Sequence, residues 1–129
     1  MIPYKPDGYN AVSPYFVVDG ASHLIDRLIT VFDAESLRSY YRPDNTIMHA
    51  EVKIDDSVLM FSDATEQYPP NKLLIHIYVK DVDKTYQKAL DAGFEPLEPP
   101  QARDGDPDKR GSFQDFAGNV WSIATQLYP

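Results

Sequence analysis

The alternation of apolar and polar residues predicts a strand followed by a helix near the start of the chain. Residues 11–18 are rich in β-forming side chains and end at the turn signal Asp19-Gly20. Between residues 22 and 32, apolar residues recur at the spacing of one helical face, and Ser22 is a candidate N-cap. Turn residues then separate three short predicted strands, at residues 37–42, 46–54 and 57–62. The first half therefore reads βαβββ.

The second half repeats this order. A strand is predicted at residues 72–79 and a helix at residues 81–92, with Gly93 as its C-terminal stop. Three further strands are expected, at residues 94–97, 112–116 and 119–126. The halves can be overlaid, which indicates an internal duplication. Two four-stranded sheets, each with a helix on its outer face, would enclose a central cup for a small ligand.

Two long segments separate predicted strands at equivalent places in the halves, residues 63–71 and 99–111. Both contain proline and acidic side chains, which is typical of a lid or of a loop on the surface. The acidic side chains would attract a cationic ligand, although acidic loops also simply keep a protein soluble.

Length, charge and composition narrow the class of protein. The 129 residues are expected to form a single domain over 1–129, with modules at about 9–63 and 72–126. Against 12 Lys and Arg stand 20 Asp and Glu, and the net charge of −8 disfavours nucleic acid as a partner. Without a long apolar run or a signal-peptide pattern, we expect a cytoplasmic protein with no membrane partner. The absence of cysteine excludes disulfides and thiolate chemistry.

Five segments can be compared with known families by their order and spacing. They are SPYFVVDGA, FDAESL, MHAEVKIDDSVLMFSD, IHIYVKDVD and DFAGNVWSIAT. Together they resemble the vicinal oxygen chelate (VOC) superfamily of glyoxalases, bleomycin and fosfomycin resistance proteins and extradiol dioxygenases, and within it the PhnB-like small proteins. The resemblance implies an α+β fold in which two tandem βαβββ modules form a cupped mixed or antiparallel sheet. It also implies a homodimer.

The metal enzymes of this superfamily hold a divalent ion with His, Gln and Glu side chains on the first and last strands of each module. The resemblance places those positions near Val12, Met60, Leu74 and Ser122. None of these four is a side chain that such an ion prefers. We therefore expect no cofactor and no standard metal centre, and a divalent metal only at a rearranged set of ligands.

His49 and Glu51 are the first candidates for chemistry. Period two places them on one face of strand 46–54, opposite an apolar row made of Met48, Ala50, Val52 and Ile54. A histidine and a carboxylate two residues apart can share a metal or act as an acid/base pair. On a strand with one wet face they are equally well ordinary solvent-facing residues, and a bulge in the strand would reverse the two faces.

His76 and Tyr78 share a face of strand 72–79 and are expected to point into the cup. His76 is either a displaced ligand, a substrate-binding imidazole, or a hydrogen-bonded histidine in a wet cavity. The same alternation gives the other lining candidates, and the full expected ligand-binding set is Phe16, Met60, His76, Tyr78, Gln114 and Ser122.

Two functions are consistent with these residues. The first is a glyoxalase-like or bleomycin-resistance-like protein that binds a small organic molecule in the cup without the standard metal centre. The second is a metal-dependent lyase, isomerase or dioxygenase of the superfamily, with His49, Glu51 and His76 as metal ligands or as catalytic acid and base. The sequence favours binding and leaves open whether the chain is an enzyme.

Overall fold

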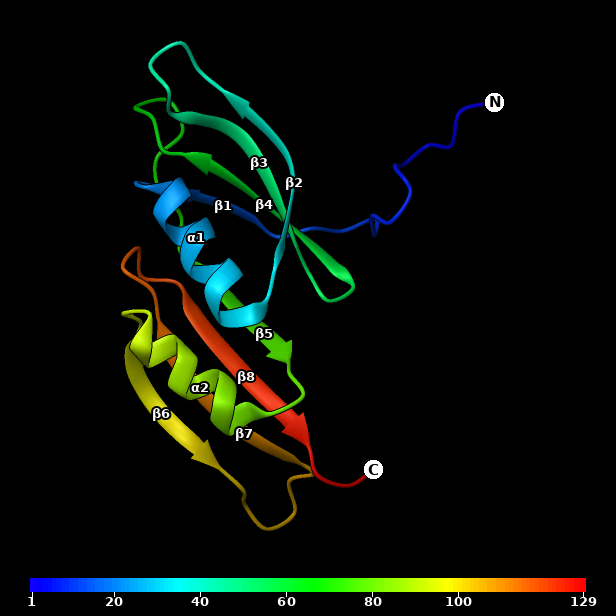
Figure 1. The fold of residues 1–129 in the computed structure, drawn as a ribbon, viewed down its shortest axis with the longest axis vertical. Helices are drawn as coiled ribbons and strands as arrows, with labels where there is room; N and C mark the ends of the chain where they lie inside the picture. The colour runs from blue at the N-terminus through cyan, green and yellow to red at the C-terminus, as the bar shows by residue number, and fades with distance from the viewer. The chain divides into compact units, whose positions relative to one another are not determined.

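The computed structural model describes residues 1–129 and divides into two compact units, residues 1–71 and residues 72–129. Each unit contains one four-stranded sheet with one helix packed on one of its faces (Figure 1). Neither helix has the length and apolar character that crossing a membrane requires.

The first unit has the order βαβββ. Strand β1 (Tyr15–Val18) leads into helix α1 (Ala21–Phe32), and the strands that follow are β2 (Glu35–Tyr41), β3 (Ile47–Ile54) and β4 (Ser57–Asp63). The sheet has the order β1-β4-β3-β2, with β1 parallel to β4 and the other neighbours antiparallel. Its outer strands are therefore β1 and β2.

The second unit repeats this arrangement. It contains strand β5 (Leu74–Tyr78), helix α2 (Val82–Asp91), and strands β6 (Glu95–Gln101), β7 (Asp108–Gln114) and β8 (Val120–Gln126). The sheet has the order β5-β8-β7-β6, with β5 parallel to β8. The predicted α+β class and the two βαβββ modules are confirmed, and both sheets are mixed.

Each helix packs its apolar face on the sheet of its own unit. Leu24 of α1 is fully buried, as its spacing predicted, and Phe16 stacks on Phe61 with ring centroids 4.7 Å apart. In the second unit, Phe113 and Trp121 are the largest fully buried side chains. Burial of large apolar side chains is the dominant favourable term in folding, so each unit has a core of its own.

The first turn of α1 is held by a carboxylate from β4 and not by the predicted Ser22 cap. Gly20 is the N-cap, with a φ of 82°, and no side chain of the cap residue bonds to the helix. Asp63 Oδ1 accepts from the backbone N–H groups of Gly20 at 3.2 Å and Ala21 at 2.9 Å. The other oxygen of Asp63 accepts from the Ile47 N–H at 2.7 Å. One side chain thus satisfies helix-terminal donors and ties α1 to β3 and β4.

The prediction of a long loop at residues 99–111 is wrong. Strand β6 continues to Gln101 and β7 begins at Asp108, so only residues 102–107 connect them. Proline suggested a loop because it cannot donate a backbone hydrogen bond. However, β6 is an outer strand that pairs only with β7, and the register shifts between Pro96 and Gln101. An outer strand tolerates proline where the missing N–H would have faced solvent.

Candidate functional site

The face of the first sheet that α1 leaves open carries the first candidate pair. Cross-strand pairing places Glu51 of β3 opposite Met60 of β4, and Met60 opposite Tyr15 of β1. Paired residues point to the same face of a sheet, and His49 shares that face because it lies two residues before Glu51. We call the surface formed by Tyr15, His49, Glu51 and Met60 the open face of the first sheet.

A line of hydrogen bonds crosses this open face. The hydroxyl of Tyr9, in the segment before β1, donates to Glu51 Oε1 at 2.5 Å. Glu51 Oε2 lies 3.0 Å from His49 Nε2, and His49 Nδ1 lies 2.9 Å from the Tyr15 hydroxyl. An ionised carboxylate can only accept, so His49 donates from Nε2 and accepts from Tyr15 at Nδ1. The structure therefore brings His49 and Glu51 together and adds a tyrosine at each end.

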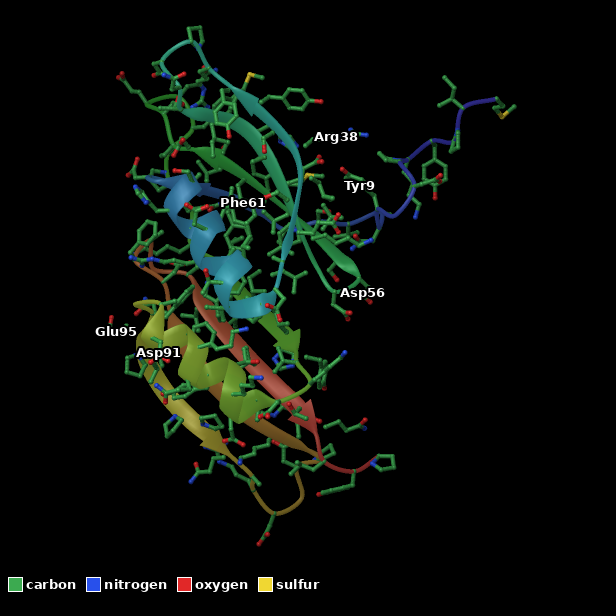
Figure 2. All side chains as sticks on the ribbon, viewed as in Figure 1. Tyr9, Arg38, Asp56, Phe61, Asp91 and Glu95 are labelled. Atoms are coloured by element: carbon green, nitrogen blue, oxygen red, sulfur yellow. The ribbon has the colours of Figure 1, made fainter.

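Aromatic rings and a cation surround this line of hydrogen bonds. The rings of Tyr15 and Tyr40 have centroids 5.7 and 6.4 Å from that of His49, and the two tyrosines are 38% and 51% exposed. The Arg38 guanidinium lies 5.3 Å from the Tyr9 ring centroid, a cation–π contact between two residues that lie close together in Figure 2. Because Glu51 is only 4% exposed, the open face presents aromatic surface around a buried charged group.

Electrostatics favours the charged form of Glu51. Burial acts to raise the pKa of the Glu51 carboxyl, but hydrogen bonds from Tyr9 and His49 outweigh burial and hold this pKa below its ordinary 4.5. The hydrogen bond to Glu51, assisted by burial, raises the pKa of the Tyr9 hydroxyl above its ordinary 10.0. A charged Glu51 accepts from His49 Nε2 and so orients the imidazole with Nδ1 toward the Tyr15 hydroxyl.

Two sequence expectations about these faces need correction. Phe16, expected to line the ligand site, is fully buried in the core of the first unit, and Tyr15 takes the exposed position. Alternation predicts two rows of side chains but does not say which row the helix covers. Met48, expected in the buried apolar row, is exposed at a bulge, where Tyr40 pairs with His49 and Tyr41 pairs with Ile47.

On the second sheet, His76 and Tyr78 of β5 share a face, as predicted. His76 Nδ1 lies 3.0 Å from the Ser122 hydroxyl on the paired strand β8, and the rings of His76 and Tyr78 meet edge-on at 5.0 Å. The Tyr78 hydroxyl donates to Asp108 Oδ2 at 2.6 Å, and this bond raises the pKa of Tyr78. Arg110 donates to the same oxygen at 3.1 Å. These polar groups therefore have partners within their own sheet.

Three further residues of the expected ligand-binding set are half-buried on the two sheets: Met60, Gln114 and Ser122. Met60 is half-buried between its paired neighbours Tyr15 and Glu51. Gln114 is half-buried and donates from Nε2 to the Gly118 carbonyl at 3.3 Å. Contact of Met60, Gln114 or Ser122 with a ligand stays a prediction.

The residues at the positions that the resemblance assigns to metal ligands do not fit a divalent ion. Their only donor atoms are a thioether and a hydroxyl, neither of which Zn²⁺ or Mn²⁺ prefers; the four residues are Val12, Met60, Leu74 and Ser122. No group of three or more His, Asp or Glu side chains is gathered closely enough to hold a metal ion. Of the three predicted catalytic candidates, His49 and Glu51 belong to the first unit and His76 to the second.

Four residues of the first site were missed by sequence reasoning: Tyr9, Tyr15, Arg38 and Tyr40. Tyr15 could have been found, because it lies in the predicted strand and adjoins the buried Phe16. Arg38 and Tyr9 carry no such signal, since Tyr9 meets Glu51 across 42 residues of chain. Local patterns do not reveal contacts of that separation.

Comparison with curated proteins finds distant, uncharacterized relatives. No model of a known protein family matches the chain. An uncharacterized protein of Mycobacterium bovis is 35% identical over 94 residues, which cover 64% of this chain and 62% of that protein. An uncharacterized protein of Mycobacterium tuberculosis H37Rv is 35% identical over 94 residues, covering 64% of this chain and 55% of that protein. The match thus spans less than two thirds of these relatives' length.

Solved structures share the fold over nearly the whole chain. TioX from Micromonospora sp. ML1 has a TM-score of 0.72 at 20% identity, covering 91% of this chain and 100% of TioX. The fosfomycin resistance protein FosX from Listeria monocytogenes, in complex with Mn(II) and sulfate, has a TM-score of 0.70 at 14% identity, covering 91% of this chain and 90% of FosX. The chain therefore has the fold of the vicinal oxygen chelate proteins.

Proposed function

We propose that the chain is a VOC superfamily member that binds a small organic molecule on the open face of its first sheet without the superfamily's metal centre. One observation carries this proposal: the buried, charged Glu51 is held by hydrogen bonds among aromatic rings that remain exposed. Small-ligand sites combine aromatic or apolar walls with a few oriented polar groups. The open face has both components.

The exposed rings favour a binding role over a purely structural one. Tyr15 and Tyr40 both flank His49 and both keep a large part of their surface accessible. Clustered exposed aromatic side chains are a common mark of an interaction surface, because each ring offers apolar area at a small cost in side-chain entropy. A planar or hydroxylated molecule suits this surface, since it can contact the rings and reach the polar groups between them.

The solved neighbours support a small-molecule ligand. One FosX structure from Listeria monocytogenes contains Mn(II) and sulfate, and another contains Mn(II) and a dihydroxypropylphosphonic acid. The proposal does not extend the Mn(II) of the FosX structures to this chain, because Val12, Met60, Leu74 and Ser122 offer no suitable set of metal ligands. We propose that Glu51, His49 and the surrounding aromatic rings bind the ligand directly, without a metal ion.

Probe titration tests the proposal. We expect p-cresol, benzylamine or benzoate, added with EDTA, to shift the amide NMR signals of Tyr15, His49 and Met60. His49→Ala should abolish the shifts, whereas His23→Ala, which alters an exposed histidine on α1, should preserve them. The proposal fails if no probe shifts these signals, or if the shifts require Mn(II) in place of EDTA.

An acid/base enzyme is the second candidate function, and the hydrogen bond between Tyr15 and His49 favours it. Glu51, His49 and Tyr15 run from a buried carboxylate to an exposed hydroxyl, an order suited to proton transfer. Turnover would appear as exchange of a bound probe's C–H protons for deuterium in D₂O. Tyr15→Phe should abolish this exchange while leaving probe binding within about threefold, because a phenyl ring keeps the aromatic contact.

The proposal includes a cytoplasmic homodimer. The outer strands of the first sheet, β1 and β2, each leave one edge unpaired within that sheet, and such edges can pair with a second chain. Sedimentation of the purified protein at micromolar concentration should therefore give the mass of two chains. The mass of one chain would remove the dimer from the proposal without affecting the ligand site.

A further inference from the structure

Tyr9 reaches the open face from a segment without regular structure. Residues 1–14 contain no helix or strand, and residues 1–8 are exposed. Besides Tyr9, the segment is tied to the sheet by Asn10, whose Oδ1 accepts from the Val58 N–H at 3.3 Å, and by the Pro14 carbonyl next to β1. Few hydrogen bonds therefore need to break for Tyr9 to leave the sheet.

The surroundings of Tyr9 recognise each part of a phenol. Glu51 accepts the hydrogen bond from the hydroxyl, and the positive charge of Arg38 faces the ring. His49 engages the second oxygen of Glu51 and thereby fixes the orientation of the carboxylate. The contact with Glu51 depends on the Tyr9 hydroxyl and the contact with Arg38 on its aromatic ring, and neither depends on the tyrosine backbone.

We propose that Glu51, His49 and Arg38 form a binding site for a phenolic ligand and that Tyr9 occupies this site while no ligand is bound. The proposal rests on the function proposed above, for which it names the ligand class and a means of regulation. The ligand's hydroxyl takes the place of the Tyr9 hydroxyl at Glu51, and its ring takes the place beside Arg38. Tyr9 is then an internal competitor.

The chemistry of Glu51 makes the site selective for a hydroxyl donor. An ionised carboxylate offers only acceptor atoms, so a ligand without a donor would leave Glu51 Oε1 unpaired in a buried position. A ligand that carries its own carboxylate would meet like charge at this point. A neutral phenol avoids both penalties and also retains the contact with Arg38.

Competition predicts that removal of Tyr9 tightens phenol binding. A ligand that must displace an internal group binds more weakly, by the fraction of molecules in which the site is free. We expect p-cresol to bind Tyr9→Ala at least about tenfold more tightly than the wild-type protein. Tyr9→Phe, which keeps the ring and removes only the hydroxyl, should also bind p-cresol more tightly and covers the case in which Tyr9→Ala does not fold.

Two controls separate this site from simple filling of a cavity. p-Methylanisole has the same ring but no hydroxyl, and it should bind Tyr9→Ala at least about tenfold more weakly than p-cresol does. In the wild-type protein, saturating p-cresol should move the amide signal of Gly8 toward its position in Tyr9→Ala, because the segment is displaced. A Tyr9 that served only stability would leave the Gly8 signal in place.

The outcomes distinguish this inference from the proposed function. Equal dissociation constants of p-cresol for the wild type and both Tyr9 variants would overturn the inference, as would equal binding of p-cresol and p-methylanisole to Tyr9→Ala. If benzylamine or benzoate still shifted Tyr15 and His49 in that case, the proposed function would stand alone. Failure of every probe to shift these signals in every variant would overturn both.

Discussion

At the scale of single residues, Glu51 departs most from what its local sequence suggests. Its place on β3 is that of a residue on a wet sheet face, yet it is almost fully buried. Burial of a charged carboxylate is tolerated only where hydrogen bonds replace its hydration, and Tyr9 and His49 supply one donor to each oxygen. The stability of the first unit should therefore depend on the charge of Glu51.

Replacement of Glu51 by glutamine tests this dependence. Glu51→Gln keeps the shape but removes the charge that both donors address, and we expect it to lower the free energy of unfolding by about 1–3 kcal/mol. Urea unfolding measures the difference. Glu98→Gln is a matched control, because Glu98 is exposed and its pair with Arg103 lies at 3.6 Å; its effect should stay within about 0.5 kcal/mol. Equal effects of the two substitutions would contradict the prediction.

The pH dependence of stability follows from the same group. The pKa of Glu51 is lower in the folded chain than its ordinary 4.5, so the ionised form stabilises the fold at pH values above 4.5. This contribution is lost as the pH falls through the lower, folded-state pKa. Urea midpoints measured between about pH 3 and pH 7 should therefore fall less steeply with acidification in Glu51→Gln than in the wild type. Parallel curves of urea midpoint against pH for the two proteins would contradict this prediction.

At the scale of elements, the start of α1 depends on a residue from another strand. Asp63 of β4 accepts from Gly20 and Ala21 at the helix N-terminus and from Ile47 of β3. The carboxylate also interacts favourably with the positive end of the helix dipole. Three elements of the first unit thus meet at one side chain.

We expect Asp63→Ala to lower the free energy of unfolding by about 2–4 kcal/mol, because three backbone donors lose their acceptor. Ser22→Ala is the informative comparison. It removes the cap that the sequence suggested, and it should change the free energy of unfolding by less than about 0.5 kcal/mol, because Ser22 does not cap the helix. Thermal or urea unfolding of both variants measures the contrast, and the reverse order would contradict the structure.

At the scale of the whole molecule, the chain consists of two units, each with its own core. Folds of roughly 60 to 70 residues bury a smaller share of their surface than larger domains do, so each unit would be marginally stable alone. A single domain over residues 1–129 stays a prediction from the length of the chain. That prediction requires the two units to unfold together.

A core truncation in one unit, observed from the other, tests this cooperativity. Phe61 is fully buried in the first unit, and Phe61→Ala should cost about 3–5 kcal/mol. Trp121, the only tryptophan, reports on the second unit by its fluorescence. We expect Phe61→Ala to lower the urea midpoint seen by Trp121, whereas Tyr41→Ala, at an exposed site, should barely move it. An unchanged Trp121 midpoint in Phe61→Ala would mean that the units unfold separately.

The sequence by itself determined the order of elements, the duplication and the buried faces of the helices. Leu24 in α1 lies on the buried face that its spacing predicted, because helical periodicity is a property of neighbouring residues. For the same reason His49 and Glu51 could be placed on one face, since alternation is inherent to an extended strand.

Only the tertiary structure decided the features that depend on residues far apart in the chain. The packing of α1 decided that Phe16, and not Tyr15, faces the helix. The sheet tolerates the prolines of β6 because that strand lies at an edge of its sheet. Asp63 reached the start of α1, and Tyr9 reached Glu51, across roughly 40 residues of chain. A local pattern indicates which secondary structure and which degree of burial a residue favours, whereas the packing of the whole unit determines its hydrogen-bond partner.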